Sequence, residues 1–364
     1  MSPAKKKTTK PKKAAAKTST SKKQKTDRKK VSLPPFDPEA PALPGSGLFG
    51  LRTTAKAARV HILPVPWEAT VSSGKGTAKA PKEVLEASKQ LDLFDADTGR
   101  PYEAGIQLLP QSSAMRRLSE ETSLLVNRAR RAASPKLLER IDKAGARLNA
   151  FVHRTASKSL ADDKLVGVLG GDHSVSFGLI EALAARHDAF GILHLDAHHD
   201  LRPAFEGFRW SHASIMYNVA ESIPQVERIV QVGVRDFCET EQRYVKDSDR
   251  RIIAHYDQEM RRAVFEGVSF RNVVHAIVQQ LPDKVYVSLD VDGLDPKLCP
   301  HTGTPVPGGL DFPEFVHLLA EVVHSGRTLI GFDVVEVGAS RDRWDANVAA
   351  RLLYKLIGFA LASQ

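Results

Sequence analysis

Short apolar runs alternate with helical patterns along most of this chain, and this alternation constrains the fold more than any other feature. The apolar runs are expected to form strands at Val60–Val65, Leu165–Leu169, Gly191–Leu195, Arg228–Val232, Arg251–Ala254, Val285–Leu289 and Leu329–Val334. Helices are expected near residues 81–91, 113–133, 135–158, 174–187, 257–281, 311–325 and 345–362. Because continuous apolar strands separated by helices are typical of a parallel sheet covered on both faces, the pattern predicts an α/β fold.

Positive charge is concentrated at the N-terminus. The 364 residues carry a net charge of +9, yet residues 1–31 alone hold 13 Lys and Arg side chains against one acid, Asp27. A segment with so few large apolar residues cannot offset the entropy of ordering, so this Lys-rich tail is expected to be disordered. It is either a solubilising extension or a weak, salt-sensitive contact for nucleic acid or another polyanion. Residues 32–58 are rich in Pro and Gly and are expected to link the tail to a catalytic domain at residues 59–364.

Cysteine content and hydropathy bear on the location of the protein. Cys238 and Cys299 are the only cysteines, and their spacing suits neither a metal site nor a disulfide framework. No run approaches the roughly 18 apolar residues of a membrane span. No apolar stretch follows the N-terminal lysines, as it would in a signal peptide. We therefore expect a cytoplasmic protein without membrane contact.

Three polar clusters interrupt the apolar strands, each at a strand's carboxyl end. They are GGDHS at residues 170–174, DAHHD at residues 196–200 and SLDVDGLDP at residues 288–296. Open parallel sheets place their sites at this edge, and side chains two apart in extended chain point the same way. The candidate metal ligands are His173, Asp196, His198, Asp200, Asp290 and Asp292.

Four carboxylates and two imidazoles at one sheet edge need cations, because buried like charges repel and desolvation adds to the cost. Two divalent ions with shared carboxylates neutralise the set better than one. Mixed oxygen and imidazole ligands suit Mn²⁺, Co²⁺, Ni²⁺ or Zn²⁺. Taken singly, each cluster has another interpretation: an Asp at a strand end is commonly a helix cap, and Asp-x-Asp-x-x-Asp also binds Ca²⁺. Independent caps would not all bring ligand-type side chains to strand ends.

The three clusters resemble the metal-binding signatures of the ureohydrolase family, which includes arginases and agmatinases. The resemblance runs from about Arg59 to the C-terminus and includes residues 64–88, VGVRD at 232–236 and DVVEVGAS at 333–340. It implies an arginase-like three-layer α/β/α fold with a central parallel sheet. It also implies two Mn²⁺ held by the six candidate ligands, with Ni²⁺, Co²⁺ or Zn²⁺ as alternatives. The implied reaction is hydrolysis of a guanidino group to urea and an amine, in a cytoplasmic homo-oligomer, often a trimer or hexamer.

The same resemblance suggests catalytic roles for three residues. Asp200 would orient the attacking water, Glu336 matches the Glu that pairs with the substrate guanidinium, and His212 matches a proton-shuttling His. A His suits proton transfer near neutral pH, and a carboxylate can pair with two N–H groups of a guanidinium.

The substrate is expected to be agmatine, giving putrescine and urea, because the chain is more agmatinase-like than arginase-like. Its HAS at residues 212–214 and EVGA at 336–339 nevertheless depart from the agmatinase HGT and the family's EVNP. A guanidino acid, free guanidine and arginine remain alternatives. Arg202 and Arg209 would favour a guanidino acid if they point into the site, and would indicate nothing if they point outward. Two rival functions stay open: a single-zinc deacetylase, and a non-catalytic protein that binds polyanions through its tail.

Overall fold

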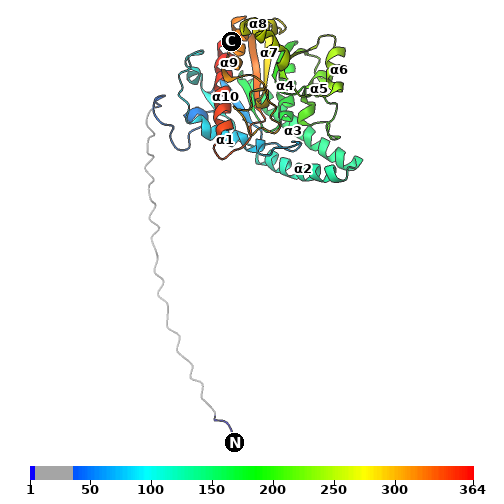
Figure 1. Cartoon of the computed structure of the whole chain (residues 1–364). Coiled ribbons are helices and arrows are strands. Elements are labelled where there is room, and N and C mark those ends of the chain that lie inside the picture. The colour runs from blue at the N-terminus through cyan, green and yellow to red at the C-terminus, as the bar shows by residue number, and fades with distance from the viewer. Residues whose placement is uncertain (5–35) are drawn as a thin grey trace. The chain divides into compact units, whose positions relative to one another are not determined.

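A twisted eight-stranded sheet forms the centre of the computed structural model, which describes residues 1–4 and 36–364 (Figure 1). The strands are β1 Val60–Pro64, β2 Ile106–Leu108, β3 Leu165–Leu169, β4 Phe190–Leu195, β5 Val226–Val234, β6 Ile252–Tyr256, β7 Lys284–Asp290 and β8 Thr328–Val335. Their order is β2-β1-β3-β8-β7-β4-β5-β6, and every pairing is parallel. The predicted α/β class and parallel sheet are therefore confirmed.

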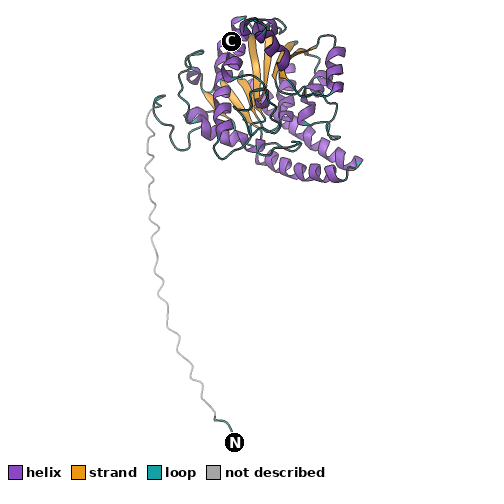
Figure 2. Cartoon of the chain, in the orientation of Figure 1, coloured by secondary structure: helices purple, strands orange, loops and turns teal. Residues whose placement is uncertain are grey.

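Helices cover both faces of this sheet, which gives three layers (Figure 2). They are α1 Ala80–Ser88, α2 Ser113–Arg131, α3 Pro135–Ala161, α4 Phe177–Ala184, α5 Ile215–Ser222, α6 Glu239–Asp247, α7 Asp257–Phe265, α8 Phe270–Val278, α9 Phe312–His324 and α10 Trp344–Ala362. Apolar side chains of α8, α9 and α10 pack on one face, and those of α3, α4 and α5 pack on the other. Among the described residues, no helix combines the length and apolar character that a membrane crossing requires.

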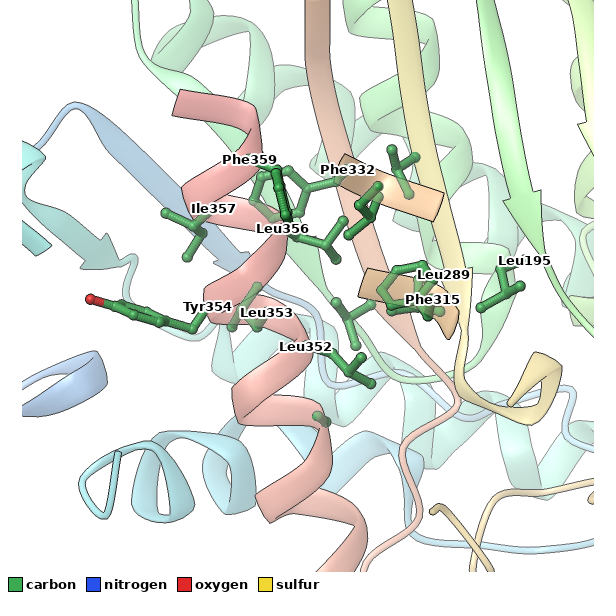
Figure 3. Packing of buried hydrophobic residues seen from close by; sticks show 14 of the residues in the cluster. Leu195, Leu289, Phe315, Phe332, Leu352, Leu353, Tyr354, Leu356, Ile357 and Phe359 are labelled. Carbon is green, nitrogen blue, oxygen red and sulfur yellow. The ribbon is translucent and has the colours of Figure 1, made fainter. Parts of the chain in front are cut away.

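The core explains why the strands are apolar on both sides. Phe332 of β8 and Leu289 of β7 are fully buried beside Phe315 of α9 and Leu356 of α10 (Figure 3). Strands buried on both faces have no polar face to present to water, so near-continuous apolar runs are required. Local signals set the helix ends: Ser134 caps α3 by accepting a hydrogen bond from the backbone of the first turn.

The prediction of individual elements was wrong in several places. The expected helix at residues 257–281 is two helices, because Gly267 adopts φ +97° and Ser269 starts and caps α8. The short helices α5 and α6 and the edge strand β2 were not predicted, since segments of three to nine residues carry little periodic signal.

The predicted tail lies almost entirely outside the described residues, since residues 5–35 are not described. Part of the predicted linker is described. Leu48, Phe49 and Leu51 are buried in the core that includes α1 and α10, and the Phe49 and Tyr354 rings pack edge to face.

Candidate metal centre

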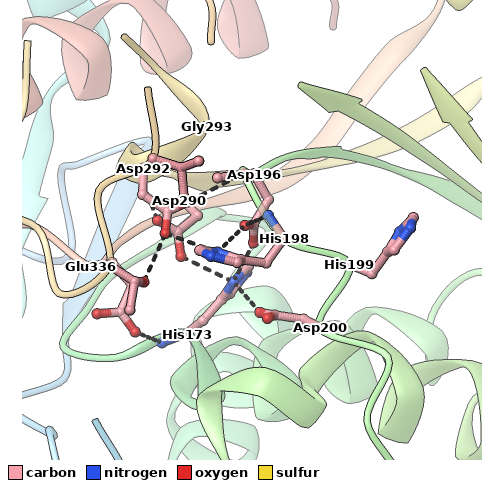
Figure 4. A network of polar contacts seen from close by, with 12 residues as sticks. His173, Asp196, His198, His199, Asp200, Asp290, Asp292, Gly293 and Glu336 are labelled. Atoms are coloured by element: carbon pink, nitrogen blue, oxygen red, sulfur yellow. Dashed lines mark hydrogen bonds and ion pairs between the residues drawn. The ribbon is translucent and has the colours of Figure 1, made fainter. Parts of the chain in front are cut away.

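Four neighbouring strands supply the residues of the candidate site. In the sheet order β3-β8-β7-β4, His173 follows β3, Glu336 follows β8, Asp290 ends β7, and the 196–200 segment follows β4. The turn after β3 is tight because Gly171 lies against the carbonyl of Trp67, where a Cβ would come within 1.6 Å of the oxygen. The sheet thus brings together side chains from segments that are far apart in sequence (Figure 4).

His173 forms the first half of the cluster. Its Nδ1 atom lies 3.0 Å from an Asp200 oxygen, 3.2 Å from an Asp196 oxygen and 3.4 Å from an Asp290 oxygen. None of these contacts has hydrogen-bond geometry, so Nδ1 is a buried nitrogen without a hydrogen-bond partner among the described residues. An imidazole nitrogen aimed between three carboxylates is the arrangement that a metal ion needs.

His198 forms the second half with Asp292. Its Nδ1 atom lies 3.1 Å from an Asp292 oxygen and 3.4 Å from an Asp196 oxygen. Asp196 therefore contacts both histidines through different oxygens. Two groups of potential ligand atoms share this one carboxylate, as two neighbouring ions require.

The spacing and charge of the cluster fit divalent ions. Neighbouring ligand atoms bound at about 2.1 Å in octahedral geometry lie about 3 Å apart, close to the separations around His173. Burial raises the pKa of Asp290 well above its ordinary value, and the charges of Asp292 and Asp196 raise it further. Burial alone would lower the pKa of His198, but the Asp292 charge and nearby carboxylate contacts raise it to about 12. Raised pKa values mean that Asp290 and His198 hold protons when no cation is bound, and bound cations would replace these protons.

A chain of hydrogen bonds fixes the orientation of His173. Its Nε2 atom lies 2.9 Å from the hydroxyl of Ser288, which itself donates to Asp333 at 2.9 Å. Because the Ser288 proton is directed at a carboxylate, the hydroxyl oxygen accepts from Nε2–H, and the lone pair of His173 is left on Nδ1. Tyr286 also donates to Asp333, at 2.7 Å. Such partners orient a metal-binding imidazole and raise its basicity.

His194 resembles a further ligand but is better assigned as a support. Its Nε2 atom lies 2.8 Å from Asp196, and its Nδ1 atom accepts from the Gln231 amide at 2.9 Å. The amide nitrogen of Gln231 also donates to the backbone carbonyl of His199, and the amide oxygen of Gln231 accepts from the His199 ring. The orientation of the Gln231 amide is therefore fixed. The proton of His194 is therefore on Nε2 and points at Asp196, which leaves no lone pair there for an ion.

Two of the predicted catalytic residues have strained backbones. Asp200 has φ +55° and Glu336 has φ +60°, in the left-handed backbone region that residues other than glycine rarely adopt. Such conformations cost about 1–3 kcal/mol and persist where the surrounding structure imposes them, often at functional sites. Burial raises the pKa of Asp200 to about 6, with the Asp196 charge adding to the effect.

Glu336 lies beside the cluster and is 6% exposed. One oxygen accepts from the His173 backbone N–H at 2.9 Å. The other has no hydrogen bond to the described residues and faces Gly303. Burial raises the pKa of Glu336 well above its ordinary value, and the Asp172 charge adds to this. A buried carboxylate with one unused oxygen can accept a cationic partner.

The loop at residues 301–304 supports both Glu336 and the cluster. Thr302 donates to the Glu336 carbonyl at 2.8 Å, and Thr304 donates to the Asp292 carboxylate at 3.1 Å. The loop packs so closely on Gly338 that a Cβ there would lie 1.8 Å from the His301 carbonyl. This contact gives a physical reason for glycine in EVGA, where the resemblance led us to expect asparagine.

His212 lies next to the cluster and lines the same cavity as His198 and Asp200. Its backbone N–H reaches Thr70, which also lies within hydrogen-bond distance of the Asp172 carboxylate. Its Nδ1 atom is buried without a partner among the described residues. Loss of hydration lowers the pKa of His212 to about 4, and nearby positive charge adds to this. A ring with this pKa is neutral at pH 7, so it would have to take up a proton before it could donate one.

Every residue named from the sequence as a candidate ligand or catalytic group thus lies at one edge of the sheet. The supporting residues His194, Gln231, Ser288 and Asp333 were missed. A sequence signal for them exists, since each is a polar residue inside an apolar strand, where a buried polar group needs a specific partner.

Comparison with known proteins agrees with this geometry. Residues 58–358 match the Arginase family. An N(1)-aminopropylagmatine ureohydrolase from Thermus thermophilus is 32% identical, covering 85% of this chain and 94% of that protein. An agmatinase from Halalkalibacterium halodurans is 27% identical, covering 80% and 88%. Proclavaminate amidino hydrolase from Streptomyces clavuligerus has a similar fold, with a TM-score of 0.69, 20% identity, and coverage of 89% and 100%. The chain therefore belongs to the arginase family.

Proposed function

We propose that this protein is a binuclear metal hydrolase that converts a guanidino compound to urea and an amine. The observation that carries the proposal is the pair of His/Asp groups that share Asp196. His173, Asp196, Asp200 and Asp290 would hold one ion, while His198, Asp196 and Asp292 would hold the other. The ions would supply the positive charge that makes water nucleophilic near neutral pH.

The protein's own groups would divide the remaining work. The unused oxygen of Glu336 would pair with the substrate guanidinium and place its carbon beside the cluster. Asp200 would accept a hydrogen bond from the attacking water. Addition of water breaks one carbon–nitrogen bond, so a guanidinium and water give urea and a protonated amine. His212 would carry the proton to the departing nitrogen.

The family membership and the His/Asp cluster support a metal-dependent enzyme. We propose Mn²⁺ as the native ion, a cytoplasmic location, and a homotrimer or homohexamer. The Lys-rich tail is proposed to make at most weak contacts with polyanions. Agmatine is the first substrate to test, because the two curated relatives are named for agmatine or its aminopropyl derivative.

The test is a urea-release assay on the full chain after loading with Mn²⁺, Co²⁺, Ni²⁺ or Zn²⁺. Agmatine, arginine, guanidinobutanoate, guanidinopropanoate and free guanidine would be compared, with metal content measured on the same samples. Urea from at least one compound and two ions per chain would support the proposal. One zinc per chain with deacetylase activity, or no turnover at all, would contradict it.

A further inference from the structure

We propose that Arg202 determines specificity, by binding a carboxylate on the tail of the substrate. The enzyme would then prefer guanidino compounds with a carboxylate tail over agmatine, whose tail ends in an ammonium group. This inference rests on the proposed guanidino hydrolysis and names the class of substrate within it.

Arg202 lies in the wall of a cavity beside the candidate metal centre. This cavity has a volume of about 180 Å³, and its walls include His198, Asp200 and His212. Arg202 and Phe205, from the loop that follows β4, line the same cavity. A substrate whose guanidinium lies at the cluster would therefore extend its tail towards Arg202.

Two side chains contact the guanidinium of Arg202, and a backbone hydrogen bond holds the residue that carries it. The guanidinium carbon of Arg202 lies 5.1 Å from the centre of the Phe205 ring, a cation–π distance. Its Nε atom lies 3.6 Å from an oxygen of Glu241, and its backbone N–H donates to the Ala213 carbonyl at 3.1 Å. These contacts use the ring face and Nε. Neither terminal Nη group has a hydrogen bond to the described residues.

The free Nη groups of this guanidinium, which packs on the Phe205 ring, can form a receptor for a carboxylate. Two parallel N–H groups match two carboxylate oxygens, and a guanidinium already oriented loses little entropy when it binds. Glu241 does not occupy this receptor, because it is buried and accepts from the backbone N–H groups of Leu201 and Cys238. These hydrogen bonds use both carboxylate oxygens of Glu241 and join this loop to the start of α6.

The Arg202 cation opposes a tail that carries only an ammonium group, although Asp200, Asp236 and Glu241 add negative charge to the same cavity wall. Such a tail would approach the Arg202 cation, and like charges at close range destabilise binding. Asp236 also lines the cavity, and its carboxylate has no hydrogen bond or ion pair with the described residues. It could accept an ammonium next to the carboxylate, as in an α-amino acid. The requirement at Arg202 is therefore a carboxylate, with or without a neighbouring ammonium group.

Arg209 provides a matched control. It belongs to the same loop and stacks on Trp210 at 5.0 Å, but it is exposed and does not line the cavity. A change at Arg209 alters the loop's charge as much as a change at Arg202, without touching the proposed receptor.

The experiment compares kcat/KM of the metal-loaded enzyme for agmatine, 4-guanidinobutanoate and L-arginine, which carry an ammonium, a carboxylate, and both. We expect at least one carboxylate substrate to exceed agmatine. Arg202→Gln should lower kcat/KM for the carboxylate substrates about ten- to a hundredfold and leave agmatine unchanged or improved. Arg202→Lys should fall between Arg202→Gln and wild type, because it keeps the charge and loses the paired N–H groups. Arg209→Gln should match wild type on all three substrates.

Two results would overturn the inference alone: agmatine exceeding both carboxylate substrates, or Arg202→Gln lowering kcat/KM equally for all three. Metal content of each variant shows whether the centre is intact. If wild type with two bound ions releases urea from none of the compounds, the proposed function fails, and this inference fails with it.

Discussion

The hydroxyl of Ser288 offers a direct test of how the proposed metal centre is oriented. It accepts from His173 Nε2 at 2.9 Å and donates to Asp333 at 2.9 Å, and Ser288 is fully buried. Ser288→Ala removes the acceptor for the imidazole proton and one donor to the carboxylate. Asp333 still receives hydrogen bonds from Tyr286 at 2.7 Å and from the Leu289 N–H at 3.1 Å. The chain should therefore remain folded.

The expected effect is on metal affinity. Loss of a partner behind a metal-binding His typically weakens affinity about ten- to a hundredfold, or about 1.4–2.7 kcal/mol. Titration of the metal-free variant with Mn²⁺, followed by calorimetry or competition with a chelator, would measure this change. Turnover at saturating metal should recover to near the wild-type value, because Ser288 contacts neither water nor substrate in the proposed mechanism.

Ser159→Ala is the matched control for this experiment. Ser159 is also buried and lies 2.9 Å from a buried histidine, His61, but it belongs to α3, outside the candidate site. It should lower the free energy of unfolding by about 1 kcal/mol and leave metal affinity unchanged. Equal Mn²⁺ affinity for wild type and Ser288→Ala, measured on folded protein, would refute the assigned role of the His173 ring.

Four further predictions follow from the same geometry. Asp290→Ala should lose bound metal and activity together while circular dichroism stays native, and a variant with two ions and full turnover would remove Asp290 from the site. Glu336→Gln should keep both ions and lower kcat/KM for every guanidino substrate by about one to two orders of magnitude, since a charge-assisted pair worth about 1.5–3 kcal/mol is lost; loss of metal would show instead that it supports a ligand. Removal of residues 1–31 should leave kcat unchanged on a small substrate, and a large drop at constant oligomeric state would disprove the separation of tail from site. His301 pairs with Asp345 at 2.7 Å, and this contact raises the pKa of His301. The decrease in Tm caused by His301→Asn should therefore be largest below about pH 6 and should shrink as the pH rises through the pKa of His301. A Tm difference that does not change with pH would contradict this prediction.

The sequence by itself determined the sheet class and the kinds of chemical group at the site. Apolar runs such as that of β3 specify buried strands through local side chains, and the polar segments at residues 170–174 and 196–200 break those runs at strand ends. Because parallel strands end at a common edge, the ligand types could be assigned before any contact was known. Short elements such as β2 and α6 were missed, because their stability comes from packing more than from their own periodicity.

Only the tertiary structure decided which atoms meet. The order β3-β8-β7-β4 brings His173 within 3.0 Å of Asp200, and the hydrogen bond from His173 to Ser288 leaves the Nδ1 lone pair facing the cluster. Two arginines of one loop differ in the same way: Arg202 lines the cavity, whereas Arg209 stacks outside it. The physical reason is that a side chain's direction depends on neighbours from distant segments, such as Glu241 beside Arg202, and no local pattern encodes those neighbours.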